Sequence, residues 1–413
     1  MTSLHCLGAS GEVGRSAFLL ETDKKIMLDY GVKLFDESGE TKYPLESVDP
    51  DYIILSHAHL DHSGAIPLLY RKAKMKWFAT APTRDIVELL WNDSLKIMGE
   101  TSPYNKAHAE KALGYWTPSP YGQKTTVGET SFWMEDAGHV AGAGITNLEY
   151  KKKKICYSGD FKMEETYMHD GAKPVEDVDY LIIESTYALR EHPPRKELER
   201  QFIDEIRETI ELGGNVLLPA FAVGRTQELV SMIRHYEKDV PVFVDGMGKD
   251  ITTIYRRYSK YIKDPMELKK AINSVRIVSS IEHKKIATKD PSVIITTAGM
   301  MNGGPVLNHL LHSLPNSKII FTGYCVEGTN GWKLQHEGQI VMDGEELEVD
   351  LPVHYMDFSA HAGKKDILEF VKKANPEKIV LIHGDQPEKF RDELESEHGY
   401  KTYAPKIGDR IDF

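Results

Sequence analysis

The chain has few cysteines and no long hydrophobic segment. Its three cysteines, Cys6, Cys156 and Cys325, lie far apart and form no C-x-x-C pair, which favours reduced core thiols over a disulfide framework. Residues 1–18 show neither the basic start nor the apolar stretch of a secretory signal. No apolar run approaches membrane-spanning length. We therefore expect a soluble cytoplasmic protein with no membrane partner.

The chain also lacks an excess of positive charge. Its net charge is −12, so binding of nucleic acid through bulk charge is not expected, and a polyanion must be drawn to a local patch. The 413 residues suggest two domains, and a hydrophobic content of 41% is enough for a sizeable core. No repeat, low-complexity tract or Pro/Ser-rich linker is present, so the domains are expected to join without flexible segments.

What the chain does contain is a dense group of metal-binding side chains. Residues 56–62 read Ser-His-Ala-His-Leu-Asp-His and follow an apolar stretch, 52–55, that predicts a buried strand. α/β folds place ligands at such strand ends, and imidazole nitrogen with carboxylate oxygen suits zinc or a similar ion. His57 and His59 can point to one position while Asp61 and His62 reach a second, which is the layout of a two-metal hydrolytic site.

Five further candidates share one placement, because each follows an apolar stretch or opens a glycine-containing loop. They are Asp29, His139, Asp160, Glu184 and His383. One such residue is usually a capping or turn residue, but five beside the H-x-H-x-D-H segment are hard to explain as turns. We predict two metal positions that share the carboxylate of Asp160. The first would be held by His57, His59 and His139, and the second by Asp61, His62 and His383.

The spacing of apolar residues changes near residue 188. Before it, short predicted strands such as 17–20, 25–28 and 180–183 alternate with polar loops. After it, apolar residues recur every four positions from Leu198 to Ile210 and predict an amphipathic helix that stops at Gly213. The segments that follow alternate in type and predict a parallel sheet. They are strands at 215–218, 242–244, 293–295 and 378–382, and helices at 225–236 and 364–374.

The motifs resemble those of the metallo-β-lactamase superfamily. Glu184 in Ile-Glu-Ser-Thr, His361 in Phe-Ser-Ala-His-Ala and His383 in Ile-His-Gly-Asp are similar to motifs A, B and C of its β-CASP branch of nucleases. Segments 8–16, 221–228 and 298–305 extend the resemblance over nearly the whole chain. It is most similar to archaeal relatives of the endonuclease subunit of the cleavage and polyadenylation specificity factor, in the form without N-terminal KH domains. No motif residue is missing, which argues against an inactive scaffold.

The resemblance implies an α/β fold with a four-layer αββα metallo-β-lactamase domain. This domain would be interrupted by an α/β β-CASP domain with a parallel sheet. The implied ranges are 1–188 for the first part, 189–355 for the β-CASP domain, and 356–413 for the segment that completes the first domain.

The resemblance also implies roles for individual residues. His361, not needed as a ligand, would be the general acid, and Glu184 would orient it and keep it protonated. Asp61 would belong to the catalytic group as well as to the ligands. Asp29 would accept the free N–H of a metal-bound histidine. The implied cofactor is a pair of zinc ions.

The substrate class is indicated by motif C and by one basic segment. Within this branch a histidine at motif C goes with RNA, so His383 indicates a ribonuclease. Residues 249–285 contain ten Lys or Arg against four Asp or Glu and could bind phosphates. Within them, Tyr255, Tyr258 and Tyr261 either stack on bases or form the packed face of a helix. Lysines 151–154 indicate either an RNA patch or, more simply, a solvated hairpin tip.

Backbone N–H groups offer a further way to bind phosphate. Arg225 opens a predicted helix after a glycine, and Gly303 and Gly304 belong to a glycine-rich loop, so both places could present N–H groups to a phosphate. Ordinary tight turns explain them about as well. The glycines at 8, 11 and 14 lack the G-x-G-x-x-G spacing, so dinucleotide binding is rejected.

The site residues and the resemblance together predict a zinc-dependent ribonuclease of single-stranded RNA, mainly endonucleolytic, in RNA processing or 3′-end formation. A 5′-to-3′ exoribonuclease of the same family is the alternative. A small-molecule metallo-hydrolase has no use for a 167-residue insert, and the complete metal set disfavours a non-catalytic RNA platform. The sequence is also compatible with a homodimer and with other RNA-processing proteins as partners.

Overall fold

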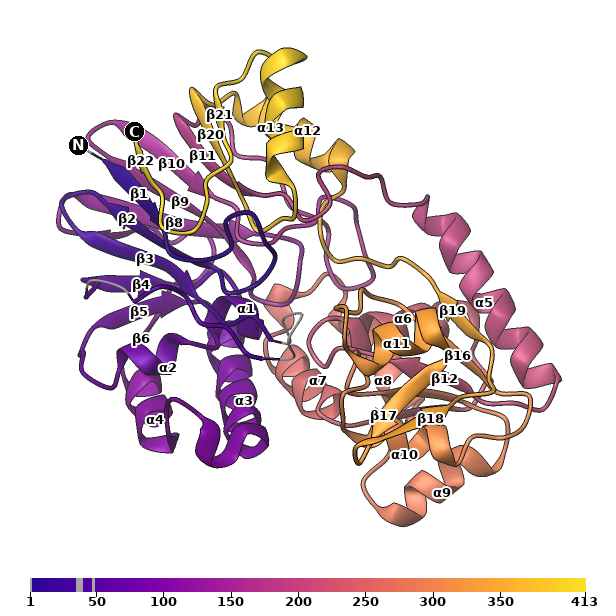
Figure 1. Cartoon of the computed structure of the whole chain (residues 1–413). Helices are drawn as coiled ribbons and strands as arrows, with labels where there is room; N and C mark the ends of the chain where they lie inside the picture. Colours follow the sequence, from indigo (N-terminus) through magenta and orange to yellow (C-terminus); the bar gives the residue numbers. More distant parts are fainter. Residues whose placement is uncertain (1, 35–39, 47–48) are drawn as a thin grey trace.

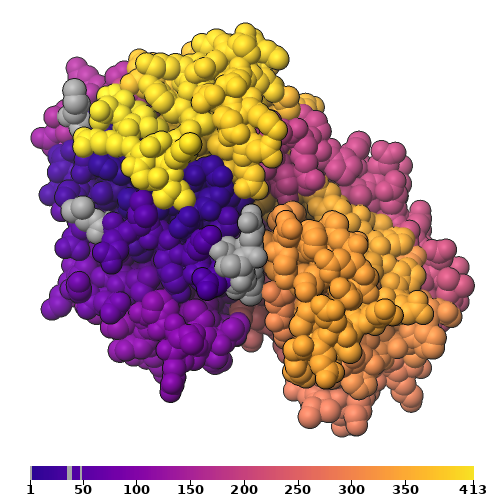
Figure 2. Space-filling view, viewed as in Figure 1, coloured from indigo at the N-terminus to yellow at the C-terminus, as the bar shows by residue number. Residues whose placement is uncertain are grey.

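The structure is a computed structural model and describes residues 2–34, 40–46 and 49–413. It has two lobes, of which the first is built from both ends of the chain and the second from its middle (Figure 1 and Figure 2). None of the helices in these ranges is long and apolar enough to cross a membrane.

Two seven-stranded sheets form the centre of the first lobe. One has the order β22 (Arg410–Asp412), β1 (Ser3–Cys6), β2 (Ala17–Glu21), β3 (Lys25–Tyr30), β4 (Tyr52–Ile54), β5 (Lys76–Ala79), β6 (Trp116–Pro118). The other has the order β21 (Thr402–Tyr403), β20 (Lys378–Ile382), β11 (Tyr180–Glu184), β10 (Lys153–Tyr157), β9 (Gly144–Tyr150), β8 (Thr130–Asp136), β7 (Thr125–Val127). Leu20 and Ile54 of one sheet share a buried cluster with Ile155 and Ile182 of the other. Because side chains alternate along a strand, the two sheets pack face to face.

Helices cover the outer faces of both sheets. Trp91 of α3 packs against Trp77 of β5, with ring centroids 6.0 Å apart, and Phe370 of α12 packs against Phe161 at 4.9 Å. The helices are α1 (Leu60–Ser63), α2 (Ile66–Leu69), α3 (Ala81–Met98), the 3₁₀ helix η1 (Gly99–Thr101), α4 (Lys106–Gly114), α12 (Lys364–Ala374) and α13 (Pro387–Ser396). The predicted αββα order of layers is confirmed.

The second lobe contains the predicted parallel sheet. Its order is β14 (Arg276–Ile277), β13 (Val242–Asp245), β15 (Val293–Thr296), β12 (Val216–Pro219), β16 (Lys318–Phe321), β19 (Val353–Tyr355), and every pairing is parallel. Around it lie α5 (Arg195–Glu211), α6 (Arg225–Tyr236), α7 (Gly248–Arg257), the 3₁₀ helix η2 (Ser259–Tyr261), α8 (Pro265–Asn273), α9 (Ile281–Lys289), α10 (Pro305–Leu311) and α11 (Asn330–Glu337). A hairpin of β17 (Gln339–Met342) and β18 (Glu345–Glu348) is added. The fold class predicted from the sequence is therefore confirmed.

The end of the chain completes the first lobe. β22 pairs antiparallel with β1, while β20 pairs in parallel with β11 and β21 with β20. The C-terminal segment (yellow in Figure 1) therefore adds one strand to the first sheet and two to the second. The boundaries at 188 and 355 stay a prediction. They agree with α5, which begins at Arg195, and with β19, which ends at Tyr355.

Two local patterns predicted the structure correctly. The helices expected at 225–236 and 364–374 are α6 and α12 with the same bounds. The lysine run is a hairpin tip, because Lys151 and Lys152 have φ values of 48° and 66° between β9 and β10. The interpretation of this run as an RNA patch is therefore not needed.

The three tyrosines of the basic segment pack against the first lobe. The hydroxyl of Tyr255 accepts a hydrogen bond from the backbone N–H of Ala141 at 3.1 Å. Tyr258 donates to Asp85 at 2.8 Å, and the ring centroid of Tyr261 lies 4.9 Å from that of Tyr121. Of the two interpretations offered above, the packed face is the one found, and base stacking by these rings is not supported.

Candidate metal centre

The seven predicted ligands converge at the carboxyl ends of strands. His57 and His59 follow β4, and Asp61 and His62 lie on the short helix α1. His139 follows β8, Asp160 follows β10 and His383 follows β20. The folding of the two sheets against each other brings four separate segments to one edge of the first lobe.

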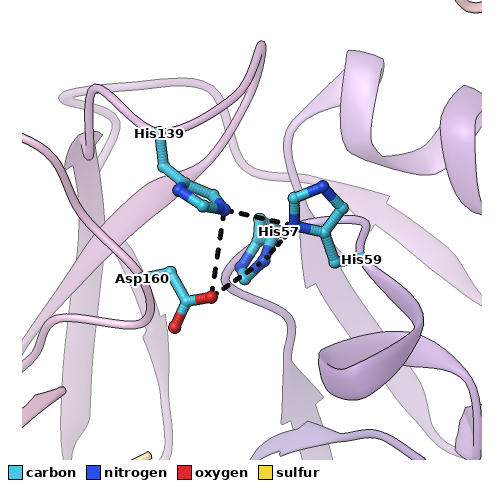
Figure 3. Close-up of side chains that lie close together, drawn as sticks. All are labelled: His57, His59, His139 and Asp160. Carbon is cyan, nitrogen blue, oxygen red and sulfur yellow. Dashed lines mark hydrogen bonds and ion pairs between the residues drawn. The ribbon is translucent and has the colours of Figure 1, made fainter. Parts of the chain in front are cut away.

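One group of donors surrounds a single point (Figure 3). Nδ1 of His59 lies 3.1 Å from Nε2 of His57 and 3.1 Å from Nε2 of His139. Oδ2 of Asp160 lies 3.5 Å from Nε2 of His57 and 3.8 Å from Nε2 of His139. The sequence placed the three histidines around one metal, and the structure brings them together in that way.

A second group lies beside the first and shares Asp160 with it. Nε2 of His62 lies 3.2 Å from Oδ2 of Asp160 and 3.9 Å from Oδ2 of Asp61. Nε2 of His383 lies 3.2 Å from Oδ2 of Asp61, and Nδ1 of the same ring lies 3.4 Å from Oδ1 of Asp160. A single carboxylate therefore faces both groups.

These donors fit zinc. A zinc ion bound about 2.0–2.1 Å from each imidazole nitrogen in a tetrahedron leaves the nitrogens roughly 3.3 Å apart. This is close to the 3.1 Å that separates His59 from His57 and from His139. Oδ1 of Asp160 is buried and accepts no hydrogen bond among the described residues, although Nδ1 of His383 lies 3.4 Å from it. Because an unpartnered buried carboxylate oxygen is costly, this atom is consistent with a cation at the site.

The electrostatics of the first group favour neutral imidazoles. Burial lowers the pKa of His57 well below its usual value, and the neighbouring ring of His62 lowers it further. Burial and the ring of His361 do the same to the pKa of His139. Neutral imidazole is the form that binds a metal. Burial raises the pKa of Asp160, but the rings of His383 and His62 outweigh it, so the pKa is lowered and the carboxylate stays ionised.

Asp29 lies behind the second group and is fully buried. Its carboxylate contacts Nδ1 of His62 at 2.6 Å and accepts hydrogen bonds from the hydroxyls of Ser56 and Tyr157, each at 2.6 Å. It also accepts the backbone N–H of Ser56 at 2.6 Å. These contacts hold the ring of His62 with Nε2 turned toward Asp160. Ser56 and Tyr157 were not identified from the sequence, although both directly precede ligand motifs.

Gly31 allows the chain to pass closely behind the same ligands. A Cβ atom at this position would lie 1.8 Å from the backbone oxygen of Asp61 and 2.5 Å from the backbone nitrogen of His62. Neither backbone atom can move without shifting the ligands. We expect Gly31→Ala to lower the stability to unfolding by about 1–3 kcal/mol and to reduce metal content.

The matched control for this prediction is Gly114→Ala. Gly114 ends α4, and a Cβ atom there meets nothing within 4 Å, so this variant should unfold with a midpoint at or above that of the wild type. Thermal unfolding followed by circular dichroism compares the two. Equal midpoints for both variants would show that the backbone at Asp61 relaxes freely.

Glu184 and His361 form a pair beside the two groups. Glu184 is fully buried and contacts Nδ1 of His361 through Oε2 at 3.0 Å. Its Oε1 accepts the N–H of Phe161 at 2.8 Å, and Thr186 donates to Oε2 at 2.5 Å. Burial lowers the pKa of His361, but Glu184 and Asp160 outweigh it and raise the pKa to about 9. Thr186 was not singled out, although it belongs to the Ile-Glu-Ser-Thr motif.

His361 also lies within reach of a ligand. Asp160, Glu184, His361 and His383 form a third set of donors close enough to hold an ion. Nδ1 of His361, the atom that faces Glu184, lies 3.8 Å from Oδ2 of Asp160. Geometry alone therefore allows His361 to be a ligand as well as an acid, and metal content of a variant separates the two.

The predicted phosphate-binding residues lie on the second lobe. Arg225 begins α6, burial lowers the pKa of its guanidinium to about 10, and its Nε has no hydrogen-bond partner among the described residues. Gly304 precedes α10, and a Cβ atom on Gly303 would meet nothing within 4 Å. No recorded contact joins these three residues to the metal-binding groups within the described ranges. Their role in binding RNA stays a prediction.

Several cations of the basic segment are paired. Arg257 contacts Asp85 at 2.9 Å, Lys270 contacts Glu267 at 2.5 Å, and Lys263 pairs with Glu165. Arg257 and Lys263 thus hold the second lobe to the first. Their positive charges are partly neutralised there, which weakens the interpretation of this segment as a phosphate-binding surface.

The fold and the donor groups define a metallo-hydrolase with an inserted second domain, and comparison with known families agrees. Residues 11–172 match the metallo-beta-lactamase superfamily, 226–334 match the Beta-Casp domain, and 346–405 match the Zn-dependent metallo-hydrolase RNA specificity domain. The chain belongs to the β-CASP family of the metallo-β-lactamase superfamily.

Individual relatives cover the whole length of the chain. "Probable RNase MJ4" of Methanocaldococcus jannaschii is 37% identical over 98% of this chain and 98% of its own length. "RNase aCSPSF2" of Saccharolobus solfataricus is 34% identical over 99% of this chain and 85% of its own. A crystal structure of a protein of unknown function from Enterococcus faecalis has the same fold, with a TM-score of 0.64, 14% identity and 99% coverage of both chains.

Proposed function

We propose that the chain cuts single-stranded RNA internally, using two zinc ions held by the groups that share Asp160. The family and its RNase-named members already identify the chain as a metal-dependent ribonuclease. We propose in addition that it binds two zinc ions, prefers single-stranded RNA and cuts within the RNA chain. The cytoplasmic location, a homodimer and other protein partners stay predictions.

The observation that carries the proposal is the position of Asp160 between the two donor groups, with the Glu184–His361 pair beside them. Zinc bound there would supply Lewis-acid polarisation of the scissile phosphate and a water acidic enough to ionise near neutral pH. Asp160 and the six other proposed ligands would hold the two ions. Asp29 keeps the ring of His62 oriented.

The proton needed by the leaving oxygen is assigned to His361. Its Nδ1 faces the carboxylate of Glu184 at 3.0 Å, which leaves Nε2 as the ring nitrogen that can donate to the leaving group. The N–H of Phe161 and the hydroxyl of Thr186 hold Glu184 in place. In this proposal the general acid, His361, is not one of the seven metal ligands, although its Nδ1 lies 3.8 Å from the ligand Asp160.

Cleavage of a circular RNA tests the proposal. A covalently closed single-stranded RNA has no ends, so only an endonuclease can open it. We expect purified protein to open the circle with zinc present and to leave it intact after treatment with a chelator. If the linear RNA is degraded from its 5′ end while the circle persists, the exonuclease alternative replaces the proposal.

The metal content follows from the two groups. We expect about two zinc ions per chain, because seven ligand side chains from four segments form two groups around Asp160. Elemental analysis of protein purified without added metal provides the measurement. A value well under one ion per chain would contradict this description of the site.

The choice of nucleic acid follows from His383. A histidine at this motif position predicts rapid cleavage of single-stranded RNA and little cleavage of DNA of the same sequence. Parallel time courses on labelled RNA and DNA oligonucleotides measure the ratio. Equal rates would remove His383 as an indicator of RNA, although the fold and the metal site would stand.

A further inference from the structure

Exposed aromatic rings gather at one place on the second lobe. Of the aromatic side chains within the described residues, three are exposed: Phe221 at 39%, Tyr324 at 56% and Tyr355 at 41%. Phe221 follows β12, Tyr324 follows β16 and Tyr355 ends β19. Because these three strands are neighbours in a parallel sheet, the rings lie along the same carboxyl edge.

This edge borders the metal centre. β19 continues from Tyr355 directly into the segment that carries His361, and the carbonyl of Ala360 contacts Nδ1 of His139 at 2.8 Å. At the other end, the loop of Phe221 approaches Val140, since a Cβ atom on Gly224 would lie 2.8 Å from Cγ1 of Val140. The three rings therefore lie where the second lobe meets the site.

Phe221 is supported by backbone on one side. A Cβ atom on Gly299 would lie 3.3 Å from Cγ of Phe221, and one on Gly323 would lie 3.5 Å from Cε2. Neither glycine has a positive φ in the left-handed region, so the backbone conformation does not demand glycine there. What these positions provide is room for the ring, which rests on two loops and still exposes 39% of its surface.

Tyr324 and Tyr355 lie on the same side as charged groups of the first lobe. Burial and the carboxylate of Asp385, two residues after His383, raise the pKa of Tyr324. Arg190 lies beside Tyr355. Its guanidinium also lies over the ring of Tyr187, 4.1 Å from the centroid. The side chain of Arg190 is 46% exposed and is paired with Asp357 at 3.0 Å. Tyr324 therefore lies near the segment that carries His383, and Tyr355 lies beside Arg190.

We propose that Phe221 and Tyr324 stack on unpaired bases of the RNA next to the scissile phosphate. This inference rests on the proposed function. Every base has a face that stacks on an aromatic ring, whatever its sequence, and a ring held rigidly loses little conformational entropy on binding. In a duplex, the bases are stacked on each other and do not present these faces. The rings therefore select single strands and position the phosphate over the metal groups.

The test combines variants with abasic substrates. An oligoribonucleotide with a mapped cut site is made intact and with abasic ribose at each position flanking the cut. On intact RNA, Phe221→Ala and Tyr324→Ala are each expected to lose roughly tenfold in kcat/KM, the size of one stacked base. On the RNA that lacks the matching base, wild type shows the same loss and the variant loses nothing further.

Matched controls separate stacking from folding. Phe221→Leu keeps an apolar side chain over the two glycines but removes the aromatic face, so it should behave like Phe221→Ala with normal stability and zinc content. Tyr324→Phe keeps the ring and should behave like wild type. Ile281→Ala removes an apolar side chain on α9 that is 76% exposed and should change nothing.

The outcomes distinguish this inference from the proposed function. If wild type with zinc leaves intact RNA uncut, the proposed function fails and the inference fails with it. If wild type cuts but the variants match it, stacking is overturned while the ribonuclease stands. An equal tenfold loss by the variants on intact and on every abasic RNA also overturns stacking, because it shows that no base meets these rings.

Discussion

His361→Ala is expected to bind its zinc and its RNA normally but to cleave roughly 10²–10⁴-fold more slowly, the range of a lost general acid. The ring contacts Glu184 at 3.0 Å through Nδ1, and the ligands of both metal groups remain complete without it. Single-turnover cleavage of labelled RNA measures the chemical step, and elemental analysis of the same sample measures the zinc.

His62→Ala serves as the comparison for His361→Ala. Nε2 of His62 lies 3.2 Å from Oδ2 of Asp160, so its removal should deplete the metal as well as the activity. Partial rescue of His361→Ala by added imidazole would support the acid role. If His361→Ala loses its zinc as completely as His62→Ala, then His361 is a ligand, as its place in the third donor set allows.

Asp160→Asn is expected to reduce cleavage to the level of the chelated wild type. Asp160 faces both donor groups, and asparagine keeps the size of the side chain but removes the negative charge that offsets two cations. The loss should therefore affect both metal positions, with less than one zinc ion per chain by elemental analysis.

Asp136→Asn is the matched control for Asp160→Asn. Asp136 ends β8, a strand of the sheet whose strand β10 Asp160 follows. Its Oδ1 accepts the N–H of Gly138 at 2.9 Å, which an amide oxygen can also do. It belongs to none of the donor groups found in the described residues. Normal zinc and activity in Asp160→Asn, or loss of zinc in both variants, would remove the special place given to Asp160.

Local signals predicted the regular elements because they depend on near neighbours. The four-residue spacing of Leu198, Phe202 and Ile206 produces one apolar face, and all three side chains are buried on α5. Gly213, with a φ of 82°, follows the end of that helix. The periodicity and the glycine act within a few turns of chain, so no knowledge of the rest of the fold was needed.

Local sequence patterns could not decide whether a side chain packs against a part of the chain far away in sequence or stays exposed. Spacing alone made Tyr255, Tyr258 and Tyr261 equally suitable for packing and for stacking. Tyr255 is buried because Ala141 of the first lobe lies against it, which the sequence around Tyr255 does not reveal. The aromatic rings that are exposed instead lie on three separate loops or strand ends, and no local pattern links them.

By itself, the sequence determined the types of ligand and the positions of several strands along the chain. The segment 56–62, Asp160 and His383 identify metal chemistry, since several imidazoles and carboxylates at strand ends have few other uses. Only the tertiary structure decided which donors share a position, that Asp160 faces both groups, and that Glu184, 177 residues before His361, contacts it. The physical reason is that donor geometry depends on how the two sheets pack and on how the C-terminal segment returns to them, and these contacts join residues far apart in the chain.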